Sequence, residues 1–246
     1  MNDEMDQLLT QLRMKPLKAI VEAELVRAQK AKPSYTDFYA RILRAQHQLT
    51  RERSLAYRIE RAQLPERWAL ETFPFDKQPG VHATQMRQLA ELDFVAKHEN
   101  LVFVGPTGVG KTGLASAILL KALENGYRGL FVKAQDLFDE MYASLADRSS
   151  RKLLNRLMTV DVLLIDEMGY LTLRPEQSNL FFKLMEERYA RRSTILTTNL
   201  VYEDWYGFLG KKEMVGALLS RLCHHGHTLR IDGPSLRTPA LVSSPP

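Results

Sequence analysis

Residues 100–123 read NLVFVGPTGVGKTGLASAILLKAL, and this stretch decides the fold. An apolar run ends at Val104, a glycine-rich turn comes next, and a second, longer apolar run begins after Lys111. The first run has the length of a buried strand, whereas the second has the length and the alanine and leucine content of a helix. The sequence therefore predicts a strand at 101–104 and a helix at 111–124, joined by a turn, as in open α/β folds.

The turn matches the phosphate-binding pattern G-x-x-x-x-G-K-[ST]. Its glycines let a phosphate chain approach several backbone N–H groups, and the helix that starts there adds its positive dipole end. We expect Lys111 to contact the β- and γ-phosphates of a nucleotide and the Thr112 hydroxyl to ligate Mg²⁺. An ordinary glycine turn is the alternative, which the flanking strand and helix disfavour. The predicted nucleotide-binding residues of this loop are Gly105, Pro106, Thr107, Gly108, Val109, Gly110, Lys111, Thr112 and Gly113.

Two further apolar segments end in polar residues that suit phosphate chemistry. The segment VDVLLIDEMG (160–169) ends in an acid pair at the carboxyl end of a predicted strand, where α/β sheets bind their ligands. Asp166 suits the Mg²⁺ position, and Glu167 suits the base that polarises the attacking water. The segment STILTTN (193–199) ends in Asn199, whose carboxamide would lie between the γ-phosphate and that water. An ordinary strand exit could carry the same residues, so these predictions depend on the glycine-rich turn.

The rest of the chain has two parts. Residues 1–67 predict a small all-helical domain, in which Ser34 with Asp37 marks the start of a helix over 35–63. The proline-rich and aromatic linker 68–83 should pack onto the second domain. Strands that alternate with helices over 84–237 predict a parallel sheet covered on both faces, and 238–246 form a short tail. The further elements that we expect are strands at 129–133, 162–165 and 194–198 and helices at 84–97, 136–145, 149–158 and 175–191.

Composition narrows the class of protein. The chain has 246 residues, 45% of them hydrophobic, but no apolar run long enough to cross a membrane. Its opening residues, MNDEMDQLLTQLR, lack the pattern of an export signal, and a single cysteine excludes an internal disulfide, so we expect a cytoplasmic protein. A net charge of +5 favours an anionic partner. Cys223, His224, His225 and His227 lack a second ligand pair, so a solvated turn is favoured over a zinc site.

The segments GPTGVGKT, LLIDEMG and TILTTN, in this order, resemble the AAA+ ATPases, and in particular the bacterial subgroup of DnaC-type helicase loaders and IstB-like helpers of insertion-sequence transposition. Residues 35–76 resemble the IstB-like N-terminal region, with its arginine-rich helix, A-x-L-P motif and closing F-x-F. The resemblance implies a P-loop AAA+ core behind a small helical domain. The usual AAA+ helical lid needs more than the roughly 25 residues that follow Arg221, so we expect a reduced or absent lid. It also implies a cytoplasmic bacterial ATPase that uses ATP and Mg²⁺ and forms head-to-tail homo-oligomers.

The same resemblance assigns roles to two arginines. Arg221 in ALLSRLCHHG matches the arginine that completes the ATP site of a neighbouring subunit, where a guanidinium neutralises transition-state charge. Arg237 in DGPSLR matches a residue that senses nucleotide in its own subunit. Without the resemblance, Arg221 would be taken for a surface arginine.

Two basic stripes are candidates for contacts with DNA phosphates. One consists of Arg148, Arg151, Lys152 and Arg156, on a helix just before the acid-pair strand, where related initiators and loaders place a DNA-tracking helix. The other consists of Arg44, Arg51 and Arg58 on the long N-terminal helix. Either stripe could instead be a solvated helix face, and contacts of this kind would carry little sequence preference.

The resulting hypothesis is an ATP-dependent protein that assembles on duplex DNA, remodels it and presents it to an IstA-like transposase. The alternative is a DnaC-type loader that grips a replicative helicase and binds single-stranded DNA. A metabolic P-loop kinase is a third possibility, but it leaves the basic stripes unexplained.

Overall fold

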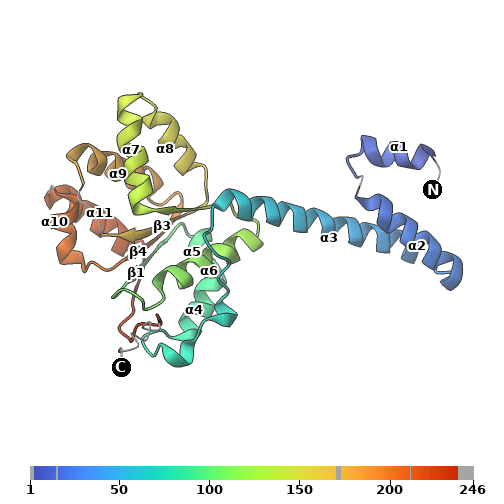
Figure 1. Cartoon of the computed structure of the whole chain (residues 1–246), viewed down its shortest axis with the longest axis horizontal. Coiled ribbons are helices and arrows are strands. Elements are labelled where there is room, and N and C mark those ends of the chain that lie inside the picture. Colours follow the sequence, from blue (N-terminus) through green and yellow to red (C-terminus); the bar gives the residue numbers. More distant parts are fainter. Residues whose placement is uncertain (1–2, 15, 170–172, 211, 238–246) are drawn as a thin grey trace, which may run out of the picture. The chain divides into compact units, whose positions relative to one another are not determined.

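The computed structural model describes residues 3–14, 16–169, 173–210 and 212–237 (Figure 1). The chain divides into two compact units, residues 1–57 and 58–246, with the boundary inside the long helix α3 (Tyr35–Ala62). The first unit also holds α1 (Asp3–Gln11) and α2 (Leu17–Ala31), which share a small core of Leu9, Leu17 and Val21. Helix α3 begins as predicted, because the Ser34 hydroxyl accepts the backbone N–H of Asp37 at 3.1 Å.

The second unit is built on a parallel sheet of five strands, in agreement with the predicted fold class. The strands are β1 (Asn100–Val104), β2 (Gly129–Lys133), β3 (Val162–Met168), β4 (Ser193–Thr198) and β5 (Gly226–Arg230), in the spatial order β2-β3-β4-β1-β5. Strand β5 was not predicted from the sequence. Its residues, GHTLR, contain no apolar run, so the sequence showed no sign of a strand, and among them only Leu229 is buried.

Helices cover both faces of this sheet (Figure 1). Alternate residues of β1 point to opposite faces: Leu101 and Phe103 join one core, Val102 and Val104 the other. The first core is closed by α4 (Ala83–Ala90), α5 (Asp93–Ala96) and α6 (Lys111–Glu124), the second by α7 (Ala134–Ala146), α8 (Ser150–Met158), α9 (Pro175–Arg188), α10 (Trp205–Leu209) and α11 (Lys212–His224). Within the described ranges, no helix is both long enough and apolar enough to span a bilayer.

The predicted single helix over 84–97 is wrong in one respect. Leu92 has a left-handed backbone, with φ of +68°, which ends α4 and starts the short α5. The side chain of Leu92 is buried in the first core, so tertiary packing stabilises a conformation that local preference disfavours. The helix predicted over 175–191 ends earlier, at Arg188.

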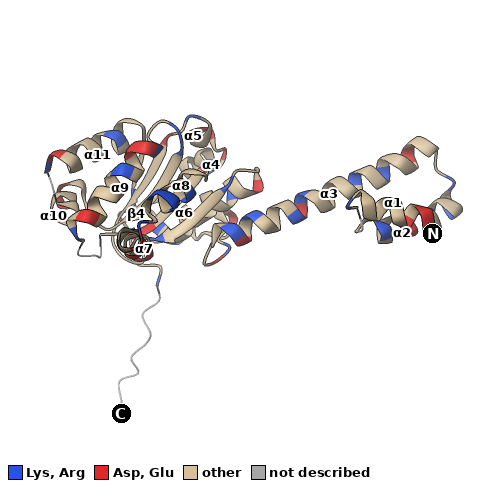
Figure 2. Cartoon of the chain, turned by 90° about the horizontal axis from the view of Figure 1, so that it is seen from above, with Lys and Arg blue, Asp and Glu red and all other residues tan. Residues whose placement is uncertain are grey.

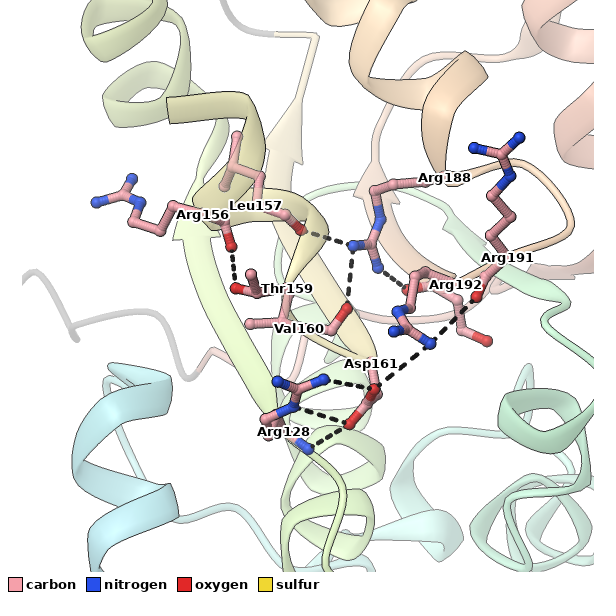
Figure 3. Close-up of polar contacts among 10 residues, drawn as sticks. Arg128, Arg156, Leu157, Thr159, Val160, Asp161, Arg188, Arg191 and Arg192 are labelled. Atoms are coloured by element: carbon pink, nitrogen blue, oxygen red, sulfur yellow. Dashed lines mark hydrogen bonds and ion pairs between the residues drawn. The ribbon is translucent and has the colours of Figure 1, made fainter. Parts of the chain in front are cut away.

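Arg188 is the most deeply buried charge of the described residues and joins three elements of the second unit (Figure 3). Its guanidinium donates to the carbonyl oxygens of Leu157 at 2.7 Å, Val160 at 3.2 Å and Ser193 at 2.5 Å, and to the Thr194 hydroxyl at 3.0 Å. Burial lowers the pKa of Arg188 to about 9, so the side chain remains a cation at neutral pH. These contacts tie the end of α8 and the loop before β3 to α9 and β4.

Asp161 forms a second polar group beside Arg188, on the loop that enters β3 (Figure 3). It accepts the backbone N–H of Arg128 at 2.9 Å and forms ion pairs with the guanidinium groups of Arg128 and Arg192 at 3.4 and 3.7 Å. Burial by itself would raise the pKa of Asp161, but the hydrogen bonds and positive charges of these arginines lower it. The charge of Asp161, just before β3, is therefore neutralised by these two arginines.

Candidate nucleotide-binding site

The glycine-rich loop lies between β1 and α6, where the sequence placed it. Gly108 and Gly110 have φ of +86° and +97°, a backbone conformation that favours glycine. A Cβ atom at Gly110 would also lie 2.7 Å from the ring of Phe73, and one at Gly105 would lie 2.4 Å from the carbonyl oxygen of Ile231. Both the turn and its close packing therefore require glycine, and α6 begins directly after the loop.

Lys111 lies over this loop. Its Nζ atom donates to the carbonyl oxygens of Gly105 and Pro106, both at 2.7 Å. Burial lowers the pKa of Lys111; the negative charge of Asp166 opposes this effect, and the positive charge of Arg237 adds to it. A cation held among carbonyl dipoles at the start of a helix is positioned to exchange them for phosphate oxygens.

The acid pair lies at the carboxyl end of β3. Asp166 is buried and accepts a hydrogen bond from the Thr112 hydroxyl group. The hydroxyl oxygen lies 2.9 and 3.1 Å from the two carboxylate oxygens. The pKa of Asp166 is raised, mainly by burial and also by the negative charge of Glu167. Hydrogen bonds from Thr197 and Thr112 oppose this rise. The Thr112 hydroxyl and the Asp166 carboxylate are adjacent hard oxygen ligands, the donor set that Mg²⁺ prefers, so the site fits this ion. The side chain of Glu167 is exposed beside them.

A cavity of about 330 Å³ brings the predicted groups together. Its wall contains the phosphate loop, Glu167, Asn199 and Arg237, which come from segments far apart in the sequence. The Oδ1 atom of Asn199 is buried and has no hydrogen-bond partner among the described residues. An unpaired buried acceptor at a cavity wall is costly unless a water or a ligand satisfies it. Asn199 therefore lies at the cavity with an unused acceptor, and its role toward the attacking water stays a prediction.

The cavity also has walls that were not assigned to the site from the sequence. Trp68, Phe73 and Pro74 of the linker line it, as does Leu236. The ring of Phe73 lies against Gly110, so the expectation that the aromatic linker packs onto the second domain is confirmed. The alternation of aromatic and proline residues in 68–75 was the available signal. It indicated packing but gave no reason to prefer one surface over another.

Arg237 reaches the cavity on the segment after β5. In this segment the backbone N–H of Leu236 donates to the carbonyl oxygen of Gly108 at 2.8 Å. The buried side chain of Gln78 donates to the carbonyl oxygens of Val109 at 3.2 Å and Pro234 at 2.9 Å. The linker, the phosphate loop and the C-terminal segment are thereby connected around one site.

Arg221 lies apart from the cavity of its own chain. It belongs to α11 and is partly exposed, with its guanidinium 3.4 Å from Glu186 and its Cζ atom 6.0 Å from the ring centre of Tyr189. An exposed ion pair of this kind contributes little to stability and exchanges readily. The structure thus leaves Arg221 outside the group formed by Lys111, Asp166 and Asn199.

The candidate DNA-binding residues differ in their surroundings. Arg151 and Lys152 are exposed on α8, whose opposite face buries Leu153, Leu154 and Leu157 (Figure 2). Arg148 precedes the helix, with φ of +59°, and Arg156 pairs with Glu140 of α7 at 2.5 Å. The other predicted stripe lies on α3, where basic residues outnumber acidic ones and both are interspersed along the helix (Figure 2). Arg44 and Arg51 belong to the first unit, and Arg58, in the second, donates to the carbonyl oxygen of Leu123 at 2.8 Å.

Two of the three histidines near Cys223 have protein partners. His225 lies 3.2 Å from the carbonyl oxygen of Lys97, and His227 lies 3.0 Å from Glu99. Among the residues that the structure describes, no three His, Cys, Asp or Glu side chains are grouped closely enough to hold a metal ion.

Comparison with known proteins agrees with this geometry. The family model for the IstB-like ATP binding protein matches residues 7–242. The putative ATP-binding protein of insertion sequence IS21 from Pseudomonas aeruginosa is 37% identical over 234 residues, covering 95% of this chain and 88% of that protein. Among solved structures, the replication initiator DnaA bound to AMPPCP and single-stranded DNA aligns with a TM-score of 0.59 at 21% identity, over 70% of this chain and 52% of that one. DnaI aligns with a TM-score of 0.58 at 24% identity, over 68% and 92%.

Proposed function

Because the chain belongs to the family of IstB-like ATP-binding proteins, we propose that it is a Mg²⁺-dependent ATPase that assembles on duplex DNA, remodels it and assists a transposase. The observation that carries the proposal is that Lys111, Glu167 and Asn199 line one cavity beside the phosphate loop, and that Asp166 contacts Thr112 of this loop. Each of these groups has a distinct use in transfer of a phosphoryl group to water.

The roles within the subunit follow from position. Lys111 would hold the β- and γ-phosphates, while Thr112 and Asp166 would hold Mg²⁺, which neutralises charge on the phosphate oxygens. Glu167, exposed beside the cavity, would polarise the attacking water, and the unpaired oxygen of Asn199 would orient it. The aromatic rings of Trp68 and Phe73 line the same cavity and would limit access of bulk water to a bound nucleotide.

An oligomer would complete the site. Arg221 lies on α11 with a partly exposed side chain, held by an ion pair with Glu186 and a contact with the ring of Tyr189, so it can reach a neighbouring subunit without disrupting its own core. In a head-to-tail assembly, this guanidinium would stabilise the transition state in the next subunit. ATP that binds between subunits would then favour assembly, and assembly would raise turnover.

Of the two basic stripes, we assign contact with DNA to the one on α8 before the one on α3. Arg151 and Lys152 are exposed there, without an ion pair among the described residues, and the opposite face of the helix is anchored by leucines. Such cations bind phosphates with strong salt dependence and little sequence preference. The relatives that share most of the chain are named for insertion sequences, which favours a transposition partner over a replicative helicase.

The test is fluorescence anisotropy with duplex and single-stranded DNA in parallel, in ATP, ADP or a non-hydrolysable analogue, at two salt concentrations. We expect tight, ATP-dependent binding to duplex DNA with a steep salt dependence. A preference for single strands would favour the helicase loader instead. Binding to neither form, with or without nucleotide, would refute both functions.

A further inference from the structure

We propose that Thr197 is a positioning residue for ATP hydrolysis, with one hydroxyl group that orients both Asp166 and Glu167. The inference rests on the proposed ATPase function and adds a residue to its site. Thr197 is the penultimate residue of β4, is fully buried in the protein and belongs to the lining of the candidate nucleotide cavity.

The need for such a residue comes from an irregularity in the sheet. Strands β3 and β4 pair at Ile165 with Leu196 and pair again at Met168 with Thr198. Between these pairs, β3 contributes two residues, Asp166 and Glu167, whereas β4 contributes only Thr197. This is the geometry of a β-bulge, which interrupts the regular hydrogen bonds and redirects side chains.

The bulge places Glu167 in a conformation that needs support. Its φ is +62°, and a left-handed residue other than glycine costs about 1–2 kcal/mol. The Glu167 backbone N–H donates to the Thr197 hydroxyl oxygen at 2.9 Å, so a side chain supplies the acceptor at this break in the ladder. An N–H group buried without an acceptor would be costly, so this bond stabilises the bulged conformation.

The same hydroxyl contacts the other acid. Thr197 donates its only proton to Asp166 Oδ1 at 2.5 Å, the shorter of the two hydroxyl contacts to this carboxylate. The hydrogen bonds therefore run in one direction, from the Glu167 backbone through Thr197 to Asp166. Because the hydroxyl is fully buried and has one proton, it satisfies both neighbours in a single orientation. Loss of the hydroxyl would remove one hydrogen bond from the backbone of Glu167 and one from the carboxylate of Asp166 together.

The consequence for function is specific to the chemical step. Lys111 and the loop backbone, which would bind the phosphates, do not depend on Thr197, because Lys111 Nζ contacts the carbonyl oxygens of Gly105 and Pro106. Asp166, which would hold Mg²⁺, keeps its hydrogen bond from Thr112. A displaced Glu167 carboxylate would lose alignment with the attacking water, and misplacement by about 1 Å can cost roughly 100-fold in rate. Removal of the hydroxyl should thus lower kcat and leave nucleotide affinity nearly unchanged.

The experiment compares Thr197→Val and Thr197→Ala, which lack the hydroxyl, with Thr197→Ser, which keeps it. We would measure kcat and KM for ATP, the Kd of a fluorescent ATP analogue and the melting temperature of each full-length variant. The hydroxyl-free variants should lose about 10- to 100-fold in kcat. Their KM and Kd should stay within about threefold, and Thr197→Ser should recover most of kcat, because the hydroxyl is what positions the acids.

A matched control lies on the same strand. Thr194 is also fully buried, but its hydroxyl accepts from Arg188, and the residue is not part of the cavity wall. Thr194→Val should lower the melting temperature and leave kcat unchanged. This control distinguishes the effect of removing any buried hydroxyl group on β4 from the effect of removing the hydroxyl group that contacts both acids.

Three results would overturn the inference while leaving the ATPase function intact: normal kcat in Thr197→Val and Thr197→Ala, a rise in Kd that matches the fall in kcat, or a Thr197→Ser variant as inactive as the other two. If Thr197→Val fails to fold, the comparison of Thr197→Ala with Thr197→Ser decides the question. Wild-type protein that binds but does not hydrolyse ATP, alone or with DNA, would instead refute the proposed function, and the inference with it.

Discussion

Replacement of Arg188 by methionine tests the packing argument for the second unit (Figure 3). The substitution keeps an unbranched side chain of similar length but removes every donor. Three backbone carbonyl oxygens and the Thr194 hydroxyl then lose a hydrogen bond in the interior. At about 1 kcal/mol for each acceptor left unpaired, the loss is about 4 kcal/mol. Methionine regains part of this loss because no charge is then buried, and we expect a net loss of about 3 kcal/mol.

The assay is urea unfolding followed by tryptophan fluorescence. Both tryptophans, Trp68 and Trp205, belong to the second unit, so the signal reports on the unit that contains Arg188. In a thermal scan, a loss of this size should lower the Tm by roughly 6–12 °C in a chain of this length. Arg188→Lys should fall between the two proteins, because a single ammonium group can serve only some of the four acceptors.

Arg192→Met is the matched control. Arg192 is about one-third exposed and lies 3.7 Å from Asp161, so its loss should cost less than about 1 kcal/mol. Equal effects of Arg188→Met and Arg192→Met, or a change below about 1 kcal/mol for Arg188→Met, would refute the assignment of the buried hydrogen bonds as stabilising.

The remaining predictions concern the site and its partners. Lys111→Ala should raise the Kd of a fluorescent ATP analogue at least about tenfold and abolish turnover, whereas Glu167→Gln should bind ATP normally and lose about 100-fold or more in kcat; equal binding defects would contradict these roles. Arg221→Ala should bind ATP and lose about 1000-fold in turnover, with activity partly restored by mixing with Lys111→Ala subunits, which still supply the arginine; no restoration would argue against a contribution between subunits. Combined replacement of Arg151 and Lys152 by alanine should weaken binding to all DNA sequences alike and reduce the slope of log affinity against log salt by about 2, and an unchanged slope would remove α8 from the DNA interface.

Local sequence patterns were sufficient to predict those elements whose own residues favour one type of secondary structure. The helix predicted over 111–124 and the strand predicted over 129–133 match α6 and β2 in their bounds. Helix α6 has a long apolar run and strand β2 a short one, glycines lie near their ends, and neither needs a distant partner to be identified. The order of strands in the sheet is different, because it depends on which hydrophobic faces meet.

Prediction from the sequence failed where packing overrides local preference. Strand β5 is a mostly polar segment that becomes a strand because β1 offers it an unpaired edge. Leu92 interrupts a helical pattern because its side chain fills the core. Neither outcome follows from the residues of the segment alone.

The same division applies to the site. The phosphate loop, Asp166, Glu167 and Asn199 were predicted as site residues because each ends or follows an apolar strand, and parallel strands bring their carboxyl ends to one edge. No sequence pattern of this kind indicated Thr197 or Trp68 as site residues. One became a bridge through a β-bulge and the other became part of a cavity wall through the path of the linker.

By itself, the sequence determined the class of fold and the place of the candidate nucleotide site, because glycine conformation, strand length and the chemistry of lysine and carboxylate side chains act over a few residues. Only the tertiary structure decided how the acids are held, which arginine is buried and which lies at the surface. Arg188 and Arg221 are both helix arginines in the sequence, yet one donates to four interior acceptors and the other meets an exposed glutamate. Their difference comes from the desolvation of one charge and the hydration of the other, which depends on what the rest of the chain places around them.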